Sequence, residues 1–305
     1  MDELQKHMLD EISGIHEIPE GAYNIRSNGK SIGRSSTANI QIDTKIDKPG
    51  IDIRIKPGTV HESVHIPVIL SETGLTDLVY NDFYIGEGSD VTIVAGCGIH
   101  NCGNQKSQHD GIHTFYIDKN AKVKYIEKHY GEGEGTGERV LNPQTIIYME
   151  QGSYMEMETV QIKGVDSTVR ETKATLLEDA KIVIREKIMT HDKQTAETNF
   201  EVDLNGENSG ADVVSRSVAK NASRQKFLSK INGNNKCSGH TECDAIIMDQ
   251  ASVSAIPELT ANNVDASLIH EAAIGKIAGE QITKLMTFGL TESEAEAQII
   301  NGFLK

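Results

Sequence analysis

The sequence contains no tryptophan, and its 305 residues include only six phenylalanines, six prolines and four cysteines. With so few aromatic rings, the core must consist of isoleucine, valine, leucine and alanine, which suit regularly stacked strands. Four cysteines in a chain of this length exclude a dense disulfide framework, so we expect free thiols or ligands in a reducing compartment. No stretch approaches about 18 apolar residues, and the N-terminus is acidic and amphipathic, so we expect a cytoplasmic protein without a membrane partner.

Positive charge is also scarce, because 30 Lys and Arg stand against 45 Asp and Glu, which gives a net charge of −15. This acidity disfavours nucleic acids and anionic membranes as partners. The glycine-rich run 131–137 lacks the Lys-Ser/Thr pair of a phosphate-binding loop and carries two carboxylates that repel phosphate. We interpret this run as a flexible loop.

Short segments of alternating apolar and polar residues follow one another from about Gly21 to His270, and this period of two predicts β-strands. Small or turn-forming residues precede many of these segments. Such starts occur at Gly88-Ser89, Asn120-Ala121, Gly152-Ser153, Asp179-Ala180, Gly210-Ala211, Gln250-Ala251 and Asp265-Ala266. Counted from residue 89, the steps between them are about 32, 32, 27, 31, 40 and 15 residues, close to multiples of a half-turn of roughly 15 residues.

The repeat favours a right-handed parallel β-helix over residues 21–271. A small residue is needed at each corner of such a coil, because neighbouring coils lie only about 4.8 Å apart. The competing architecture is an antiparallel sandwich, whose hairpin turns come every 8–12 residues or so and favour Asn-Gly or Asp-Gly. Such hairpin signals are scarce in this sequence.

Both ends of the chain are predicted to be helical. Residues 1–20 form an N-terminal segment in which Leu4, Met8 and Ile12 recur at helical intervals. Residues 272–305 form a C-terminal segment with helices expected at about 275–288 and 292–303, the second of which begins with a Thr-x-x-Glu capping box. The C-terminal helices either dock a partner or only cap the open end of the coil.

A first group of candidate ligands lies at the C-terminal end of the β region. Residues 237–243 contain Cys237, His240 and Cys243, and His270-Glu271 follow. Thiolate, imidazole and carboxylate together suit iron or zinc, and thiolates in particular suit iron–sulfur clusters. The spacing is not that of a closed zinc site, however, and a single cysteine in a strand is often only a small buried apolar residue.

A second group of candidates is Cys97, His100, Cys102, His109 and His113. Two thiols and three imidazoles within 17 residues could bind a metal or accept sulfur. Glycines at four positions between 96 and 111 suggest a loop that folds around an ion. The simpler alternative is a glycine-rich connection whose histidines face the solvent.

The C-terminal third also carries ordered motifs. Gly-His-Thr-Glu-Cys-Asp-Ala-Ile-Ile occupies 239–247, Pro-Glu-Leu occupies 257–259 and His-Glu-Ala-Ala-Ile-Gly-Lys-Ile occupies 270–277. The helical tail reads Gly-Leu-Thr-Glu-Ser-Glu-Ala at 289–295 and Ile-Ile-Asn-Gly-Phe at 299–303. In this order the motifs resemble the C-terminal core of the SufB and SufD proteins of iron–sulfur cluster assembly. The resemblance is close over about 200–305 and looser over the middle of the chain.

The resemblance implies a scaffold protein of a SUF-type assembly complex and not an enzyme. It implies that Cys243 is the cluster-assembly cysteine, Glu271 the carboxylate ligand of the SufB type and His270 the imidazole ligand of the SufD type. In the family such ligands lie where two subunits meet, so a homodimer of this chain could supply both halves of the ligand set for a cluster. The cargo would be a transient iron–sulfur cluster, most simply of the 4Fe-4S type.

The resemblance also implies partners. A SufC-like ABC-type ATPase would be a separate subunit, because this sequence has no Walker motif, and a sulfur donor and apo-protein recipients would complete the system. Residues on the C-terminal helices are implied to bind the ATPase, namely Lys276, Leu290, Thr291, Ala295, Ile299 and Phe303. The alternative functions are a β-helical carbohydrate-active enzyme, against which the lack of tryptophan counts, and a purely structural solenoid.

Overall fold

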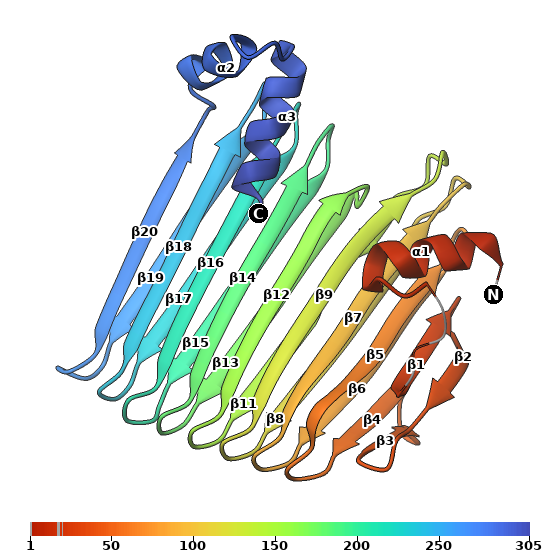
Figure 1. Cartoon of the computed structure of the whole chain (residues 1–305), viewed down its shortest axis with the longest axis vertical. Coiled ribbons are helices and arrows are strands. Elements are labelled where there is room, and N and C mark those ends of the chain that lie inside the picture. Colours follow the sequence, from red (N-terminus) through yellow and green to blue (C-terminus); the bar gives the residue numbers. More distant parts are fainter. Residues whose placement is uncertain (1, 17–18, 20) are drawn as a thin grey trace.

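Alternation of side chains explains why the strands stack into a coil. In β14 (Lys181–Thr190), for example, every second residue from Ile182 to Ile188 is buried, while Val183, Arg185 and Lys187 between them are partly exposed. The computed structural model describes residues 2–16, 19 and 21–305. The chain winds into a β-solenoid whose two sheets enclose a long apolar interior (Figure 1). The predicted β-helical architecture is therefore confirmed.

The first sheet, sheet A, carries α1 on its outer face. In spatial order its strands are β2 (Lys30–Ser35), β1 (Ala22–Ser27), β5 (Val60–Leu70), β7 (Asp90–His100), β9 (Lys122–Glu132), β12 (Tyr154–Lys163), β14, β16 (Gly210–Ala219), β18 (Ser238–Ile247) and β20 (Ser267–Gly275). Neighbours from β1 and β5 onward pair in parallel, whereas β1 and β2 are antiparallel.

The second sheet, sheet B, lies behind sheet A in Figure 1. Its strands are, in spatial order, β19 (Ser252–Ala261), β17 (Arg224–Gly233), β15 (Thr195–Leu204), β13 (Ser167–Leu176), β10 (Arg139–Leu141), β8 (Ser107–Ile117), β6 (Thr76–Ile85), β4 (Gly50–Ile55) and β3 (Ile40–Thr44). The strand β11 (Gln144–Met149) continues β10 between β8 and β13.

One full coil contains a strand from each sheet. Lys122 pairs with Tyr154, 32 residues further on, and Tyr154 pairs with Lys181, 27 residues further on. The expected half-turn of about 15 residues is half of such a coil. The irregular last steps in the sequence repeat arise because Ala251 precedes β19 in sheet B, whereas the other starts precede strands of sheet A.

Left-handed backbone conformations turn the chain at one edge of the coil. Gly88, Asn120, Gly152 and Asp179 have φ between 56° and 70°, a region that glycine, asparagine and aspartate adopt most easily. Each is followed by a buried serine or alanine. Their backbone N–H groups donate to the next coil, as from Asn120 to the Gln151 carbonyl at 3.0 Å. The small residues expected at the corners are therefore present for the expected reason.

The N-terminal helix α1 (Glu3–Ser13) covers part of the outer face of sheet A. Asp2 and Gln5 form its capping box, and its buried residues include Met8 and Ile12. A methyl group on Gly96 of β7 would lie 2.5 Å from the Ile12 carbonyl oxygen, so glycine is needed for the helix to approach the sheet this closely. Of the predicted 1–20 segment, residues 1, 17, 18 and 20 lie outside the described residues.

The C-terminal end consists of α2 (Gly279–Met286) and α3 (Glu292–Phe303). Thr291 and Glu294 form the predicted capping box, and Ile300 and Leu304 pack against Val218 of the solenoid. The β region, however, extends beyond the expected boundary at Glu271, because β20 pairs with β18 as far as Gly275. No helix within the described ranges is both long and apolar enough to cross a membrane.

Candidate functional site

Polar side chains enter the interior of the solenoid in register from coil to coil. One inward row on sheet A consists of Glu127, Thr159, Glu186, Ser215 and Cys243. A neighbouring row begins with Cys97, His129 and Gln161. Because buried polar groups require partners, Glu127, His129 and Glu186 of these rows join hydrogen-bond networks, whereas Thr159 Oγ1 has no partner among the described residues.

Cys97 lies in the best connected part of this interior. Burial alone would raise the pKa of its thiol, but the nearby imidazoles of His109 and His129 outweigh burial and lower the pKa to about 7. Burial likewise opposes protonation of His109, yet Cys97 and Asp77 raise the pKa of His109 to about 10. His109 Nδ1 lies 3.1 Å from a carboxylate oxygen of Asp77. At pH 7 about half of the buried Cys97 thiol is therefore ionised beside the imidazolium of His109.

A buried arginine connects this region with the next carboxylate of the row. Arg170 of β13 donates to Glu127, its Nη2 lies 3.3 Å from His129 Nδ1, and its Nε lies 3.7 Å from Glu186. Burial raises the pKa of Glu127, but Arg170 and then His129 hold it well below the usual range. For Glu186 burial prevails and the pKa is raised, despite Arg170 and hydrogen bonds from Ser215 and Thr198.

His113 is neutral where His109 is positively charged, although both side chains point inward from β8. Burial lowers the pKa of His113 to about 4, so the ring is neutral at pH 7. Its Nδ1 lies 2.8 Å from the Tyr125 hydroxyl, which donates to Glu127 at 3.0 Å, and its Nε2 lies 3.2 Å from the Asn81 amide. The ring is therefore satisfied as a neutral hydrogen-bonding group.

Cys243 of β18 is the last residue of this row that can ionise, because the next position in register is Ala272 of β20, the last strand of sheet A. Its side chain is 1% exposed. Burial, followed by the carboxylates of Glu186 and Asp244, raises the pKa of its thiol to about 12. The thiol is therefore protonated at neutral pH, and a metal ion would have to displace the proton to bind.

His270 and Glu271 lie on opposite faces of β20. His270 pairs with Thr241 and follows the inward parity, as Cys243 does, and its Nδ1 is buried with no hydrogen-bond partner among the described residues. Glu271 pairs with Glu242 on the outer face and is exposed. The structure thus places Cys243 and His270 on the same face of neighbouring strands and separates Glu271 from both.

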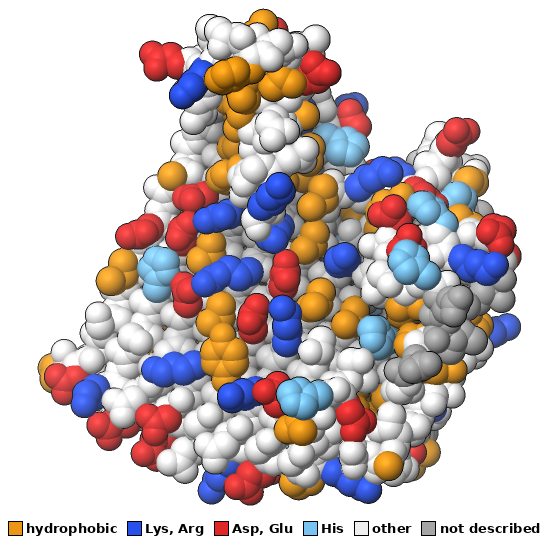
Figure 2. Space-filling model, in the orientation of Figure 1, with side chains coloured by type: hydrophobic (Ala, Val, Ile, Leu, Met, Phe, Trp, Pro, Cys, Tyr) orange, Lys and Arg blue, Asp and Glu red, His pale blue; other side chains and the backbone are white. Residues whose placement is uncertain are grey.

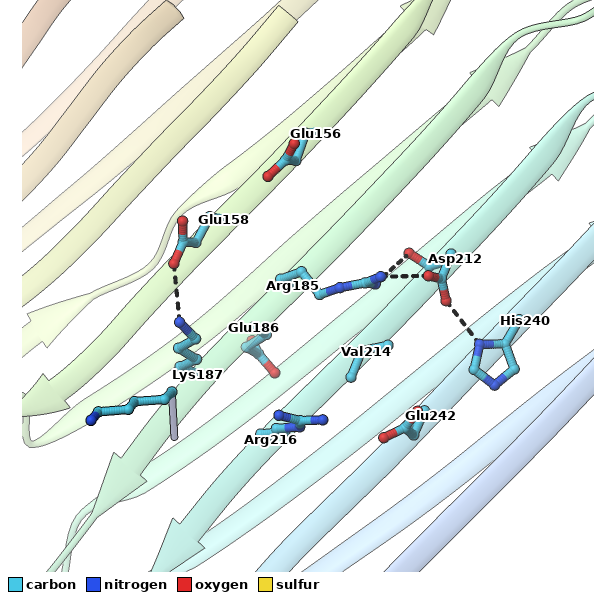
Figure 3. Close-up of a pocket in the computed structure, with 11 residues that line it drawn as sticks. Glu156, Glu158, Arg185, Glu186, Lys187, Asp212, Val214, Arg216, His240 and Glu242 are labelled. Carbon is cyan, nitrogen blue, oxygen red and sulfur yellow. Dashed lines mark hydrogen bonds and ion pairs between the residues drawn. The ribbon is translucent and has the colours of Figure 1, made fainter. Parts of the chain in front are cut away.

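The outer face of sheet A carries charges of both signs between α3 and α1 (Figure 2). A hollow there is lined by residues that include Arg185, Asp212, Arg216, His240 and Glu242 (Figure 3). Burial would raise the pKa of Asp212, but hydrogen bonds from His240 and Arg185 lower it. His240 therefore belongs to this outer surface and not to the interior that contains Cys243.

The exposed thiol of Cys102 lies beside a histidine and a glutamate. Its Sγ is 3.0 Å from His100 Nε2, and His100 Nδ1 is 3.0 Å from Glu132. Glu132 also accepts a hydrogen bond from Tyr130 at 2.8 Å. A thiol next to an imidazole that a carboxylate orients has the arrangement of a nucleophile with its base.

The expectation that residues 96–111 form a glycine-rich loop around an ion is wrong. Cys97 and His100 lie in β7, and His109 and His113 lie in β8, with only the short connection that contains Cys102 between the strands. The alternative of solvent-facing histidines is also wrong for His109 and His113, which are 2% and 4% exposed. Both expectations fail because this glycine-rich stretch forms two strands, and His109 and His113 point inward from the second. Gly96 and Gly98 do not mark a loop but leave room for α1 to pack on sheet A.

The remaining candidate residues lie at the end of the solenoid and in the C-terminal segment. Cys237 is buried at the corner before β18, and burial raises the pKa of its thiol. Of the residues expected to bind a partner, Thr291 caps α3, Ala295 is fully buried and Phe303 packs beside Ile300. Lys276 is exposed, and Leu290 and Ile299 are half-buried. Large apolar side chains of the tail that are exposed belong to Met286 and Phe288 instead.

Several residues of the interior were not predicted from the sequence, namely Asp77, Glu127, His129, Arg170 and Glu186, and neither was Glu242 of the outer face. For Asp77 and Glu186 the available signal was a charged residue at a position whose neighbours at i−2 and i+2 are apolar. Glu186 between Ile184 and Ile188 is an example. Such a position points into the core, and a charged residue there requires a partner from another coil.

Fold and site together define a β-solenoid scaffold with ionisable thiols and imidazoles in its interior. Residues 79–303 match the family model described as "SUF system FeS cluster assembly, SufBD core domain". The chain belongs to this SufBD family of iron–sulfur cluster assembly proteins.

Named relatives agree with this assignment. A SufBD family protein of Archaeoglobus fulgidus is 31% identical over 266 residues, which cover 85% of this chain and 69% of the relative. One from Methanothermobacter thermautotrophicus is 28% identical over 264 residues, or 84% of this chain and 62% of the relative. One from Pyrococcus horikoshii is 25% identical over 296 residues, or 97% of this chain and 84% of the relative. The chain thus spans about two thirds of the first two relatives, and family membership favours cluster assembly over a carbohydrate-active β-helix.

Proposed function

We propose that this chain is a scaffold on which an iron–sulfur cluster, of the 4Fe-4S type, is built and from which it is released, with Cys243 as the thiolate ligand. One observation carries the proposal: a cysteine within the SufBD core match lies one strand from the free C-terminal edge of the solenoid. His270 supports it, because its buried Nδ1 has no partner in the described structure and it shares the inner face with Cys243. Glu271 would act at the same edge from the outer face.

A homodimer through the C-terminal edge is part of this proposal. The edge strands β19 and β20 leave backbone groups unpaired, and they expose Ile256 and Ile269. Pairing of two copies there would bring both thiols and both imidazoles to one junction. Light scattering of Ile256→Lys should show a monomer, whereas Ile32→Lys, on the edge strand at the opposite end, should remain dimeric.

The tail helices are proposed to dock a SufC-like ABC-type ATPase. Phe288 is 76% exposed and Met286 is 45% exposed, so this end of α2 offers apolar area that is not covered by the solenoid. Phe288→Asp should abolish co-purification with the ATPase, and Ile46→Asp, at an exposed position near β3 and β4, should not. Unchanged co-purification of Phe288→Asp would place the docking surface elsewhere.

Sulfur is proposed to enter through Cys97 or Cys102. Cys97 is supported by its pKa of about 7, which makes it a thiolate near neutral pH, and Cys102 by its exposure and its contact with His100. A persulfide donor and apo-protein recipients would be the partners on either side of assembly.

Anaerobic reconstitution with iron and sulfide tests the central proposal. The wild-type protein should acquire the brown colour of a cluster, Cys243→Ala should not, and Glu271→Ala should hold less iron. Cys237→Ala is the matched control, because Cys237 is also buried near the C-terminal end of the solenoid and should be dispensable. Full cluster content in Cys243→Ala would refute the assignment of this ligand.

A further inference from the structure

Three side chains that could bind a metal converge on the outer face of the last two strands of sheet A. They are His240 and Glu242 of β18 and Glu271 of β20. One ligand atom from each lies within 4.8 Å of the other two. Glu242 and Glu271 are direct neighbours in the parallel register, and His240 precedes Glu242 by two residues on the same face.

A fourth residue orients the histidine toward the two carboxylates. His240 Nδ1 lies 2.8 Å from a carboxylate oxygen of Asp212, and Asp212 is held from its other side by Arg185 at 2.6 Å (Figure 3). With Nδ1–H donated to Asp212, the lone pair of Nε2 is free, and Nε2 lies 3.7 Å from Glu271. A carboxylate that fixes the tautomer and direction of a histidine in this way is characteristic of metal-binding imidazoles.

The donor set indicates the class of ion. One imidazole and two carboxylates suit a divalent first-row metal such as iron(II), because magnesium and calcium prefer oxygen ligands alone and soft ions prefer thiolates. Three protein ligands also leave coordination positions open, which allows the ion to be passed on. Glu242 directly precedes Cys243 in β18. The carboxylate of Glu242 and the thiol of Cys243 therefore lie on opposite faces of sheet A.

We propose that His240, Glu242 and Glu271 bind an iron(II)-type cation on the outer face of sheet A, with Asp212 as a positioning residue. The site is a loading position for iron at the edge where the cluster is assembled. Binding of the ion stands on the geometry of these residues alone, and only the use of the ion for a cluster rests on the proposed function.

Titration with cobalt(II) in the absence of sulfide tests the site, because the absorption bands of cobalt(II) report its ligands. The wild-type protein should bind one ion per chain without the intense thiolate bands that cysteine ligation gives. Glu242→Gln should weaken binding by at least about tenfold, and Asp212→Asn should weaken it by about 10–100-fold. The matched control is Glu156→Gln, a carboxylate of the same hollow that lies on β12, and it should bind as the wild type does.

The outcomes separate this site from the cluster site. Cys243→Ala should lose the reconstituted cluster and keep cobalt(II) binding, whereas Glu242→Gln should lose cobalt(II) binding. Equal affinities of the wild type, Glu242→Gln and Glu156→Gln would overturn the proposal, and so would cobalt bands that disappear in Cys243→Ala. Isothermal titration with anaerobic iron(II) should rank the same variants in the same order, and a different order would contradict iron as the ion.

Discussion

Two buried cysteines in the same solenoid have opposite surroundings. Cys97 lies among His109 and His129, which lower its pKa to about 7, whereas Cys243 lies beside Glu186 and Asp244 in a site that raises its pKa to about 12. Both side chains are at most 5% exposed, so burial does not distinguish them. The sign of the nearest charges does, and all of these charges except that of Asp244 come from other strands.

The difference suggests a division of labour along the interior. A thiolate at neutral pH attacks a sulfur donor readily, whereas a protonated thiol stays unreactive until a metal displaces its proton. The row Glu127, Thr159, Glu186, Ser215 and Cys243 connects the two regions in register, with Arg170 between Glu127 and Glu186. We therefore expect that a substitution near one of the two cysteines changes the pKa of that thiol and leaves the pKa of the other unchanged.

The largest effect is expected for Arg170→Met. Glu127 and Glu186 would remain buried without their cation, and breaking a buried ion pair from one side typically destabilises a protein by about 3–5 kcal/mol. Arg185→Met is the control, because the pair of Arg185 with Asp212 is more than one third exposed and contributes about 0–1 kcal/mol. Urea unfolding of both variants measures the difference, and equal losses would show that the interior network does not stabilise the fold.

The next effect concerns the ionisation of Cys97. His109→Gln removes the imidazolium beside the thiol, so the pKa of Cys97 should rise by about two pH units, and the thiolate fraction at pH 7 should fall from roughly half to about 1%. The ultraviolet absorbance of the thiolate, followed against pH, measures this change. The protein also carries Cys102→Ser and Cys237→Ser, so that these two thiols do not contribute to the absorbance.

His113→Gln is the control for that titration. His113 is as buried as His109, but its pKa of about 4 makes it neutral at pH 7, so its loss removes no positive charge from the region. The titration of Cys97 should stay near pH 7 in this variant. A shift of the same size in both variants would mean that packing, and not the charge of His109, sets the pKa.

Much of the architecture could be predicted because its determinants are local. A left-handed residue such as Asn120 followed by the small Ala121 marks a corner, and Thr291 with Glu294 marks the start of a helix, whatever the rest of the chain does. The extent of β20 was missed because its pairing with β18, not its own pattern, extends it to Gly275.

The site was harder to predict because it depends on register between coils of unequal length. Adjacent residues in a strand point to opposite faces, so His270 and Glu271 could not share a face, although their proximity in sequence suggested a common site. To predict that Glu186 meets Arg170, or that His240 meets Asp212, one must know how many residues each coil contains. From β7 to β14 alone this number changes from 32 to 27. Sequence alone does not give that number.

The smallest effect is expected for Glu186→Gln, and it tests the Cys243 half of the comparison. Loss of the carboxylate should lower the pKa of Cys243 from about 12 by less than about one unit, because burial is the larger cause. At fixed pH, binding of cadmium to the thiolate should then strengthen by up to about tenfold, since less free energy is needed to remove the proton. The cadmium–thiolate absorption band of a protein with Ser at 97, 102 and 237 measures this affinity, with Glu158→Gln, on the outer face of β12, as the control. A weaker band in Glu186→Gln would show that Glu186 helps to bind the metal, and a band in neither protein would mean that Cys243 is closed to metal ions and cannot anchor a cluster.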